Sequence, residues 1–325
     1  MALLQVDNLT VEFNSPRGWF KALDNFTMRI EEGAYHGIIG ESGSGKSIAM
    51  MAIMGLLGSN ARVSADRLAL NGEDILTMSH ERRRETLYQD VSIIFQEPKN
   101  SLNPCFKIKT QLQETLKGHG YDTNSACQSR SQQLLADVGI NNVDAILNSY
   151  PHQLTAGVLQ RVMIAIALAC DPKVLIADEP TTELPPTEAY QMMMLLNDLV
   201  KQRNMAMILI SHDLELLRES ADHISIMYCS QIVEQGSNEI IFNRARHPYT
   251  LSILAGIPVN WSFEPKTHVP VLKGSKPSPQ NLPVGCFLGP RCEYADTKCV
   301  QAPQPKYDEN HMIRCHFPVG VKSDG

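Results

Sequence analysis

Residues 37–57 read GIIGESGSGKSIAMMAIMGLL, which joins a strand-like run, a glycine-rich turn and a helix-like run. The apolar run Gly37–Ile39 predicts a short buried strand, and the apolar periodicity of Ser47–Leu57 predicts a helix. Between them lies the turn Gly40–Ser47. Glycines allow backbone N–H groups to turn inward around phosphate oxygens, and the positive end of the following helix points to the same place. The segment therefore predicts a phosphate-binding loop.

Each residue type in this turn suits one part of a bound nucleoside triphosphate. Lys46 is expected to reach the β- and γ-phosphates, and the Ser47 hydroxyl is expected to bind Mg²⁺. The other positions expected to line the nucleotide are Gly40, Glu41, Ser42, Gly43, Ser44 and Gly45. A single glycine-rich turn can match this pattern by chance. Motifs elsewhere in the chain make chance a poor explanation.

Two adjacent carboxylates end an apolar run further along the chain, where Val174–Ala177 is followed by Asp178 and Glu179. A buried strand would otherwise be expected to end in neutral turn residues. Asp178 suits Mg²⁺. Glu179 suits the attacking water, because a carboxylate beside a γ-phosphate can orient and polarise that water. The alternative is a solvated strand end that Pro180 terminates.

Polar side chains also follow two other apolar runs. Gln96 follows Val91–Phe95, and His212 comes just after Met207–Ile210. Both side chains are expected at the same sheet edge as the phosphates, because ligands of α/β sheets bind at the carboxyl ends of the strands. Each can then sense the γ-phosphate or its water, so both join Glu179 as predicted catalytic residues. The alternative for each is a satisfied polar residue at a strand end.

The remainder of the chain alternates between strand-like and helix-like patterns. Residues 1–35 alternate apolar and polar positions, which predicts antiparallel strands of an accessory sheet. Phe13 in this sheet is expected to stack on adenine, with a core aromatic as the alternative. Residues 97–165 are largely polar and helix-like, which predicts an inserted helical lobe. A helical stretch at Glu188–Lys201 between two apolar runs favours parallel strands, so the predicted fold class is α/β.

Composition and charge exclude several classes of protein. The 325 residues are 43% hydrophobic and 20% charged, which is ordinary for a globular protein of two or three lobes. The formal net charge of −6 leaves no basic field to hold a nucleic-acid backbone. The N-terminal sequence lacks a signal-peptide pattern, and no run approaches the roughly 18 apolar residues of a spanning helix. We expect a cytoplasmic chain that reaches a membrane only through a partner.

Taken together, the motifs resemble the ATP-binding cassette (ABC) ATPase family over about residues 3–250. The resemblance rests on the order and spacing of GESGSGKS, Gln96, LTAGVLQRV (154–162), LIADEP (175–180) and His212. It implies a P-loop NTPase cassette at residues 1–255, with a RecA-like core, an antiparallel β subdomain and a helical subdomain inserted at about 97–165. It also implies ATP as the ligand and Mg²⁺ held by Ser47, Gln96 and Asp178.

In this family two cassettes face head to tail, and each ATP lies between one phosphate loop and the other chain's signature sequence. Thr155 and Gly157 would then contact the nucleotide of a partner. Two segments depart from the family pattern: residues 154–158 read LTAGV instead of LSGGQ, and residues 182–185 read TELP instead of Ser-Ala-Leu-Asp. Ala156 adds a Cβ where close approach favours glycine. We expect an active phosphate site in this chain and a weak reciprocal site, with neutral drift as the alternative.

The tail of the chain carries a narrower resemblance. After Pro248 the apolar periodicity gives way to spaced prolines, which predicts a linker into a small C-terminal module at residues 256–325. The prolines are Pro258, Pro265, Pro270, Pro277, Pro279 and Pro283. The motifs HPYT (247–250), LPVGC (282–286) and PRC (290–292) look like the tail of the oligopeptide and dipeptide (Opp/Dpp) importer ATPases. The segments RVSADRL, LGPRCEYA and CHFP look closest to the Sap-type subfamily.

Four cysteines lie in this module, at Cys286, Cys292, Cys299 and Cys315. The gaps between them are five, six and fifteen residues, and four thiolates gathered by a proline-rich loop can close around iron or zinc. Relatives of this tail are associated with a 4Fe–4S cluster, so the resemblance implies that cluster, with zinc and free thiols as alternatives. The other cysteines are expected to be packing residues: Cys105, Cys127, Cys170 and Cys229.

The resemblance implies the ATP-hydrolysing subunit of an ABC transporter for peptides. Its implied partners are a second ABC ATPase subunit in a heterodimer, two membrane permease subunits and a periplasmic substrate-binding protein, with no nucleic acid. The chain would lie peripherally on the cytoplasmic face of the inner membrane. The alternatives are a putrescine or polyamine export ATPase of the same Sap-type complex and a catalytically weak regulatory subunit. A cassette protein acting on ribosomes or DNA would carry tandem cassettes, coiled-coil arms or basic patches, which this sequence lacks.

Overall fold

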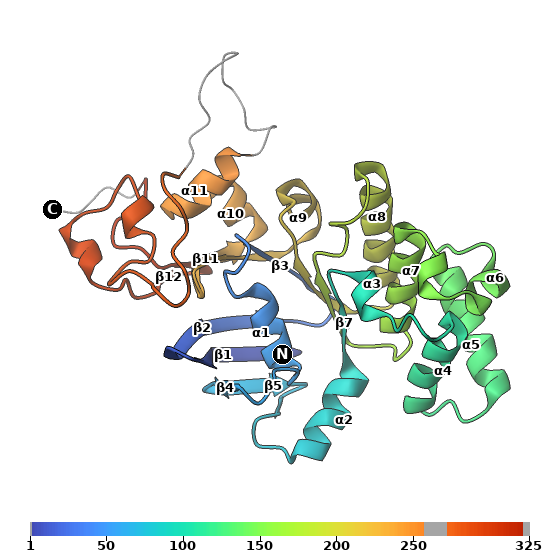
Figure 1. Cartoon of the computed structure of the whole chain (residues 1–325). Coiled ribbons are helices and arrows are strands. Elements are labelled where there is room, and N and C mark those ends of the chain that lie inside the picture. Colours follow the sequence, from blue (N-terminus) through green and yellow to red (C-terminus); the bar gives the residue numbers. More distant parts are fainter. Residues whose placement is uncertain (1, 257–271, 321–325) are drawn as a thin grey trace. The chain divides into compact units, whose positions relative to one another are not determined.

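The structure is a computed structural model that describes residues 2–256 and 272–320 (Figure 1). Contacts divide the chain into two compact units. The first unit comprises residues 1–30, 35–74 and 210–325, and the second comprises residues 31–34 and 75–209. The division expected at residue 255 stays a prediction. Three prolines of the expected linker, Pro258, Pro265 and Pro270, lie outside the described residues.

The first unit contains the antiparallel sheet expected from residues 1–35. Its long strands β1 (Leu4–Ser15) and β2 (Gly18–Ile30) pair antiparallel, and the strand order is β2-β1-β5-β6, with β4 also paired to β1. The shorter strands are β4 (Ala61–Ser64), β5 (Arg67–Leu70) and β6 (Glu73–Asp74). The alternation of buried and exposed residues in β1 is interrupted at Asn8, which has a φ of 53°. The pairing with β2 shifts register at this point, and Leu9 is buried as a result.

A second sheet of the first unit leads into the phosphate loop. The strand order is β12-β13-β11-β10-β3, and β3 (Tyr35–Gly40) is parallel to β10 (His223–Tyr228). The remaining strands pair antiparallel: β11 (Gln231–Ser237), β12 (Lys306–Asp308) and β13 (His311–Ile313). The helices of this unit are α1 (Lys46–Ile53), α9 (Leu214–Ser220), α10 (Asn238–Arg244) and α11 (Pro248–Ala255), with short helical turns η3 (Gly289–Arg291) and η4 (Thr297–Val300). The C-terminal strands therefore belong to the same unit as the phosphate loop.

The helix after the phosphate loop is shorter than the apolar pattern to Leu57 predicted. It ends at Ile53 because Gly55 adopts the left-handed conformation, with φ of 69°. The Leu56 N–H then donates to the Met51 carbonyl over 2.8 Å, which closes the last turn in a Schellman arrangement. The apolar periodicity of the sequence continues past Gly55, so it does not reveal where the helix ends.

The second unit contains three neighbouring strands in the order β9-β8-β7, and β7 and β8 are parallel. The strands are β7 (Val91–Ile94), β8 (Val174–Asp178) and β9 (Ala206–Ile210). The helices are α2 (His80–Asp90), α3 (Pro98–Ser101), α4 (Ile108–Gly118), α5 (Asn124–Asp137), α6 (Val143–Asn148), α7 (Ala156–Ala167) and α8 (Pro186–Gln202), with the helical turn η1 (Pro151–Gln153). In the described part of the chain, no helix combines the length and the apolar character needed to span a membrane.

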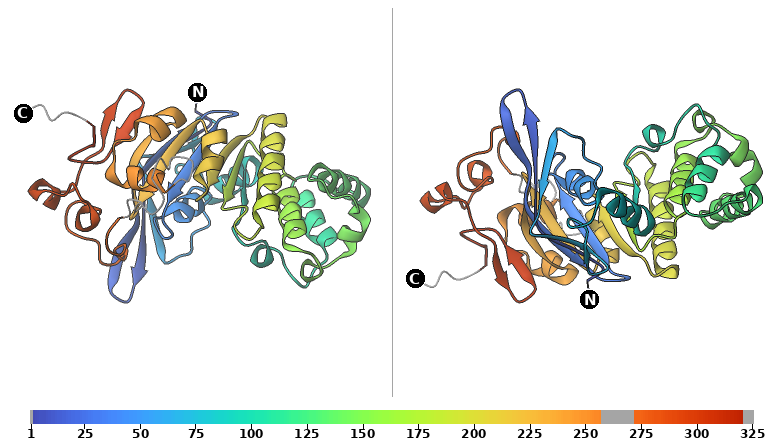
Figure 2. Two further views of the ribbon diagram at one scale, coloured as in Figure 1. Left: turned by 90° about the horizontal axis from the view of Figure 1, so that it is seen from above. Right: turned by 90° about the horizontal axis from the view of Figure 1, so that it is seen from below.

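The helical insert is a group of helices packed on one another. Helices α4 and α5 contact each other, and each of them contacts both α6 and α7; both views of Figure 2 show the group together, coloured from turquoise to yellow-green. The buried face of α4 consists of Ile108, Leu112 and Leu116, which are spaced one helical turn apart. Each such burial stabilises the fold by roughly 1.5–3 kcal/mol. The polar sequence of this region therefore still provides an apolar stripe sufficient for packing.

A buried polar cluster fixes the C-terminal strands of the first unit. Glu234 in β11 is fully buried and accepts the backbone N–H groups of Arg246 (2.7 Å) and His247 (3.2 Å). The ring of His311 in β13 bonds to the same carboxylate over 2.8 Å. Burial lowers the pKa of His247 to about 3, so its ring is neutral and its Nδ1 accepts the N–H of Tyr249 over 3.2 Å. The cluster thereby ties β11, β13 and the start of α11 together.

The cysteines expected to be packing residues differ in burial. Cys127 and Cys229 are buried, and Cys170 is partly buried. Cys105 is exposed, so the prediction for that residue was wrong. It lies in the turn between α3 and α4, where its N–H bonds to the side chain of Asn103 over 3.0 Å, and a residue used in a surface turn has no core to join.

Candidate nucleotide site

The residues of the predicted nucleotide site belong to both units, and each set has a defined geometry within its own unit. In the first unit β3 ends at Gly40, and α1 begins at Lys46. Ser42 and Gly43 at the tip of the loop are exposed, whereas Ser44 and Lys46 are buried. The loop therefore exposes its tip and packs its base, as a strand, phosphate loop and helix should.

Two glycines are required by the backbone of the loop. Gly45 has a φ of 103°, in the left-handed region that residues with a Cβ rarely adopt, and a Cβ there would lie 2.9 Å from the Ala22 carbonyl oxygen. A Cβ at Gly40 would overlap the carbonyl oxygen of Met227 in the neighbouring strand β10. Close approach of backbone segments therefore demands glycine at both ends of the loop.

Lys46 lies at the base of the loop with its ammonium against loop carbonyls. Its Nζ donates to the carbonyl oxygens of Gly40 (2.7 Å) and Glu41 (3.2 Å). The nearby Ser44 Oγ is buried and has no hydrogen-bond partner among the described residues. A buried cation and an unsatisfied hydroxyl in a glycine-rich turn can bind a phosphate chain. Ser47, in the first turn of α1, is partly exposed.

His212 follows a segment that runs beside β3 in the first unit. The N–H of Ser211 donates to the Ile38 carbonyl over 3.3 Å, two residues before β3 ends. His212 itself is exposed. Asp213 then caps α9 by accepting two N–H groups of its first turn, each at 3.1 Å. The capped turn follows directly on His212, and the role of His212 at the phosphates stays a prediction.

Phe13 lies on β1 in the first unit and is partly buried. Its ring centroid is 6.2 Å from that of Phe20 on β2, with the planes tilted by 31°. The pair leaves part of the Phe13 side chain accessible. Stacking on adenine stays a prediction.

In the second unit the two predicted carboxylates diverge at the end of β8. Asp178 is the last residue of the strand and is 7% exposed. Glu179 has a φ of 47°, so the chain turns sharply there. The Glu179 Oε2 accepts the Gln96 amide Nε2 (3.1 Å) and the Thr182 hydroxyl (3.1 Å). The structure thus brings the predicted Gln96 and Glu179 together and adds Thr182.

The meeting of Gln96 and Glu179 follows from strand register. Strands β7 and β8 are parallel, with Ile94 opposite Ala177, so the residues after each strand emerge at one edge. The turn after Glu179 is closed by the Thr182 N–H, which donates to the Glu179 carbonyl over 3.3 Å. Thr182 was not among the site residues predicted from the sequence. The signal that could have indicated it is a hydroxyl residue three positions after the carboxylate.

The altered signature segment lies at the start of α7. Thr155 occupies the N-cap position without a side-chain cap bond, and Ala156 and Gly157 form the first turn. A Cβ at Gly157 would lie 2.8 Å from the Glu188 carboxylate. Pro185 occupies the N-cap position of α8. A helix start favours anions, and the contact of Thr155 and Gly157 with a partner's nucleotide stays a prediction.

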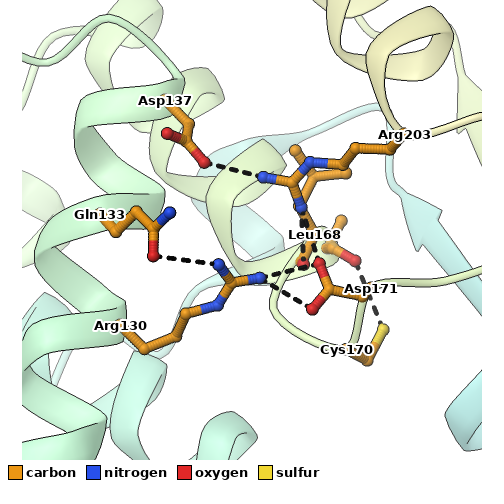
Figure 3. Close-up of polar contacts among 8 residues, drawn as sticks. Arg130, Gln133, Asp137, Leu168, Cys170, Asp171 and Arg203 are labelled. Carbon is orange, nitrogen blue, oxygen red and sulfur yellow. Dashed lines mark hydrogen bonds and ion pairs between the residues drawn. The ribbon is translucent and has the colours of Figure 1, made fainter.

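An ion-pair network supports the segment between α7 and β8 in the second unit (Figure 3). Arg130 of α5 donates to both Asp171 carboxylate oxygens, each at 2.8 Å. Arg203, which follows α8, donates to Asp171 (2.9 Å) and to Asp137 (2.8 Å). The arginine side chains are 15% and 19% exposed, whereas the shared Asp171 side chain is 60% exposed, so solvent screens these bonds in part. The network anchors the strand that carries Asp178.

The four cysteines of the C-terminal module are all partly buried in the first unit. Burial, with a smaller effect of neighbouring thiols, raises the pKa of Cys286 and Cys292, and it raises the pKa of Cys315 to about 11. The Cys286 N–H donates to the Cys299 carbonyl over 2.9 Å. Within residues 2–256 and 272–320, however, His, Cys, Asp and Glu side chains form no group of three or more that could hold a metal ion.

Two partners of the phosphate loop have no signal in the sequence. The hydroxyl of Tyr249 accepts the N–H of Glu41 over 3.1 Å. The guanidinium of Arg291 donates to the Glu41 carboxylate over 3.3 Å. These residues are 208 and 250 positions from Glu41, so no local periodicity connects them.

The loop between β3 and α1 in the first unit and the two carboxylates at the end of β8 in the second are features of a nucleotide-binding ATPase cassette. Solved structures share the fold. The ATP-binding cassette MJ0796, in a dimeric post-hydrolysis state bound to ADP and Pi, is 22% identical with a TM-score of 0.64, over 72% of this chain and 98% of that one. The protein cbiO1 from Clostridium perfringens is 26% identical with a TM-score of 0.63, over 75% of this chain and 91% of that one. The predicted cassette fold is confirmed.

Sequence comparison identifies the family. The ABC transporter model matches residues 23–182, and the model of the oligopeptide/dipeptide transporter C-terminal region matches residues 233–299. The dipeptide transport ATP-binding protein DppD of Haemophilus influenzae is 44% identical over all of this chain and 98% of the relative. The peptide transport system ATP-binding protein SapD of Salmonella typhimurium is 41% identical over the full length of both. The chain therefore belongs to the ABC transporter family, in which it is an ATP-hydrolysing subunit.

Replacing Asp171 by asparagine should destabilise the second unit. Both arginines lose their shared carboxylate, while side-chain size and tolerance of the observed φ of 46° are kept, so we expect a loss of about 1–2 kcal/mol in unfolding free energy. Chemical denaturation followed by circular dichroism measures it. Glu239→Gln, which removes an exposed pair with Arg244 at 3.4 Å, should cost less than about 0.5 kcal/mol. Equal effects of the two variants would contradict the assigned role.

Proposed function

We propose that the chain supplies the energy of ATP hydrolysis to a transporter of peptides. Two relatives that match over essentially the whole chain are named for peptide or dipeptide transport. A family model of oligopeptide and dipeptide transporters also matches residues 233–299. Together these similarities favour peptides over the putrescine or polyamine alternative.

The phosphate loop binds the nucleotide. Its backbone N–H groups and the start of α1 surround the phosphates, and Lys46 neutralises the charge of the β- and γ-phosphates. The buried position of Lys46 at the base of the loop supports this role. Mg²⁺ held by Ser47, Asp178 and Gln96 would neutralise the remaining phosphate charge. Phe13 stacks on the adenine.

Glu179 prepares the attacking water, and His212 senses the γ-phosphate. The observation that carries this proposal is the double anchoring of the Glu179 carboxylate, whose Oε2 accepts from Gln96 and Thr182, each at 3.1 Å. A carboxylate fixed in direction before a water arrives loses little freedom on reaction, which is the requirement for positioning a nucleophile.

The two composite sites of the assembled transporter differ in strength. A partner's signature sequence completes the site of this chain, whereas Thr155, Ala156 and Gly157 form the signature offered in return. Ala156 carries a Cβ in the first turn of α7, where a phosphate would approach the backbone. Pro185 supplies no carboxylate to the seam between cassettes. A catalytically weak regulatory subunit is the second candidate, and it rests on these departures alone.

The proposed assembly joins this chain to a second ABC ATPase subunit in a heterodimer and to two membrane permeases. It is supported by the names of the relatives, which are ATP-binding proteins of peptide transport. A periplasmic substrate-binding protein delivers the cargo. The chain binds peripherally at the cytoplasmic face of the inner membrane through those permeases.

The four cysteines of the C-terminal module are proposed to hold a 4Fe–4S cluster, with zinc as the alternative. They are Cys286, Cys292, Cys299 and Cys315. Neighbouring thiols of the set contribute, after burial, to the raised pKa of Cys286, Cys292 and Cys315, which indicates one neighbourhood. Backbone N–H groups of Gly289, Tyr294 and Phe317 bond to thiols of the set. Thiolates with such donors suit iron–sulfur clusters. As described they form no group that could hold a metal, so the sulfurs must close together on loading. No step of ATP hydrolysis is assigned to the cluster.

Replacing Glu179 by glutamine tests the catalytic assignment. In the assembled transporter, Glu179→Gln should retain MgATP binding, because the amide can keep the anchoring bonds. The rate of phosphate release should fall by about 10²-fold or more, because the base that polarises the water is lost. Glu114→Gln, at an exposed carboxylate of α4 in the same unit, is the matched control and should hydrolyse ATP normally.

The same preparation distinguishes the cargo. Peptides delivered by the binding protein should stimulate hydrolysis in the control variant, and putrescine should not. Near-normal hydrolysis by Glu179→Gln contradicts the catalytic role of that carboxylate, and stimulation by putrescine alone contradicts peptide transport.

Metal content tests the cysteine proposal. Protein purified without oxygen should contain iron and sulfide and show the broad visible absorbance of an iron–sulfur cluster, because four thiolates favour that group. Cys286→Ser combined with Cys299→Ser should abolish this content, and the exposed-site variant Cys105→Ser should keep it. Zinc without iron would support the alternative metal, and neither metal would show that the thiols are free.

A further inference from the structure

The C-terminal module of the first unit touches the phosphate loop directly. Arg291, at the end of the turn η3, donates from Nη1 to both Glu41 carboxylate oxygens, at 3.3 and 3.5 Å. Lys276 donates from Nζ to the Ser42 carbonyl, and the same ammonium would lie 3.2 Å from a Cβ at Gly43. Two cations of the tail therefore contact consecutive residues of the loop.

Glu41 joins three separate groups to the loop. Its carboxylate accepts from Arg291, and its N–H donates to the Tyr249 hydroxyl over 3.1 Å. Its carbonyl oxygen accepts from Lys46 Nζ over 3.2 Å. The residue that the tail holds is thus the residue whose carbonyl contacts the phosphate-binding lysine. A shift of the Glu41 backbone would move both the start of the loop and a partner of Lys46.

Arg291 is itself held in place on all sides. Its side chain is only 10% exposed, its Nε donates to the Lys273 carbonyl over 3.2 Å, and its Nη1 also donates to the Tyr228 hydroxyl over 3.2 Å. The rings of Tyr228 and Tyr249 are buried and their centroids lie 4.7 Å apart. A guanidinium with so little exposure forms a stronger and better directed pair than a surface cation does.

We infer that Arg291 is a positioning residue for the phosphate loop, through which the C-terminal module tunes the affinity for nucleotide. The inference rests on the proposed nucleotide role of the loop. Arg291 touches no reacting atom. It holds the Glu41 carboxylate, so the first turn of the loop keeps the shape that phosphates require. The entropy cost of ordering the loop when nucleotide binds is then smaller.

This role predicts a particular pattern of kinetic change. Loss of Arg291 should weaken the binding of nucleotide, whereas Glu179, in the second unit, keeps its own anchoring partners. The KM for ATP should therefore rise while kcat changes little. If Arg291 had only a structural role, its loss would lower the thermal stability without raising the KM for ATP selectively over kcat.

The experiment compares Arg291→Ala with Lys273→Ala in the full-length chain. The Lys273 side chain is 84% exposed and pairs with Glu293 only at 4.0 Å, so its removal deletes one positive charge from the same segment without touching the loop. Calorimetric titration with MgATPγS should show about five- to ten-fold weaker binding for Arg291→Ala and unchanged binding for Lys273→Ala. Arg291→Lys keeps the positive charge but not the planar guanidinium with its several N–H donors. Its affinity for MgATPγS should lie between those of the two alanine variants.

Two further measurements complete the test. By reciprocity, MgATPγS should slow amide hydrogen exchange in residues 285–295 of the wild type and of Lys273→Ala, and this effect should vanish in Arg291→Ala. If Arg291→Ala does not fold, Arg291→Gln, which removes the charge but keeps a polar side chain of similar length, takes its place and should weaken the binding of MgATPγS in the same direction.

The outcomes separate this inference from the proposed function. Wild-type nucleotide affinity and unchanged exchange protection in Arg291→Ala would overturn the inference. Lys46→Ala should bind no nucleotide. If Lys46→Ala is inactive in binding while Arg291→Ala is normal, only the positioning role fails. If Lys46→Ala binds like the wild type, the nucleotide role of the loop fails as well.

Discussion

The left-handed backbone at Gly45 is the constraint on which the phosphate loop depends. With a φ of 103° at the residue before α1, the chain turns so that the loop and the helix start face the same place. The Ala22 carbonyl lies against one end of the loop and the Met227 carbonyl against the other, so strands β2 and β10 leave no room for a side chain at Gly45 or Gly40. The surrounding first unit therefore fixes the shape of the loop before any nucleotide arrives.

Local sequence was sufficient for those parts of the fold and site that local interactions determine. A glycine-rich turn between a buried strand and a helix can be predicted because its backbone geometry requires those residues. The meeting of Gln96 with Glu179 could also be predicted, because parallel strands deliver the residues that follow them to one sheet edge. The end of α1 was misplaced, because an apolar pattern continues past the glycine that stops the helix.

Contacts between distant segments could not be predicted in this way. Tyr249 and Arg291 reach Glu41 from 208 and 250 positions away, and nothing in the spacing of either motif points to the loop. For the cysteines, the sequence suggests a site that the described structure does not show assembled. Their types and spacing suggest a metal, yet whether four thiols converge depends on loop geometry that sequence does not determine, and the described residues show no assembled group. The exposed Cys105 shows that residue type alone does not determine burial.

The C-terminal residues make structural contacts in the first unit that do not involve the cysteines. Strand β13 is tied to β11 through the buried Glu234, and the neutral ring of His247 caps the helix that carries Tyr249. These contacts place the module against the loop, where Arg291 and Tyr249 hold Glu41 from two directions. Under the positioning role inferred for Arg291, such support from a distant segment would help to preorganise the anion site.

The most direct measurement is the binding of MgATP to a Gly45→Ala variant of the full-length chain, by calorimetry. Alanine is strained at the observed φ and its Cβ approaches the Ala22 carbonyl, so the loop cannot keep its shape. The account predicts affinity at least about ten-fold weaker than that of the wild type, with an unchanged circular dichroism spectrum. Wild-type affinity in a folded Gly45→Ala protein would contradict it.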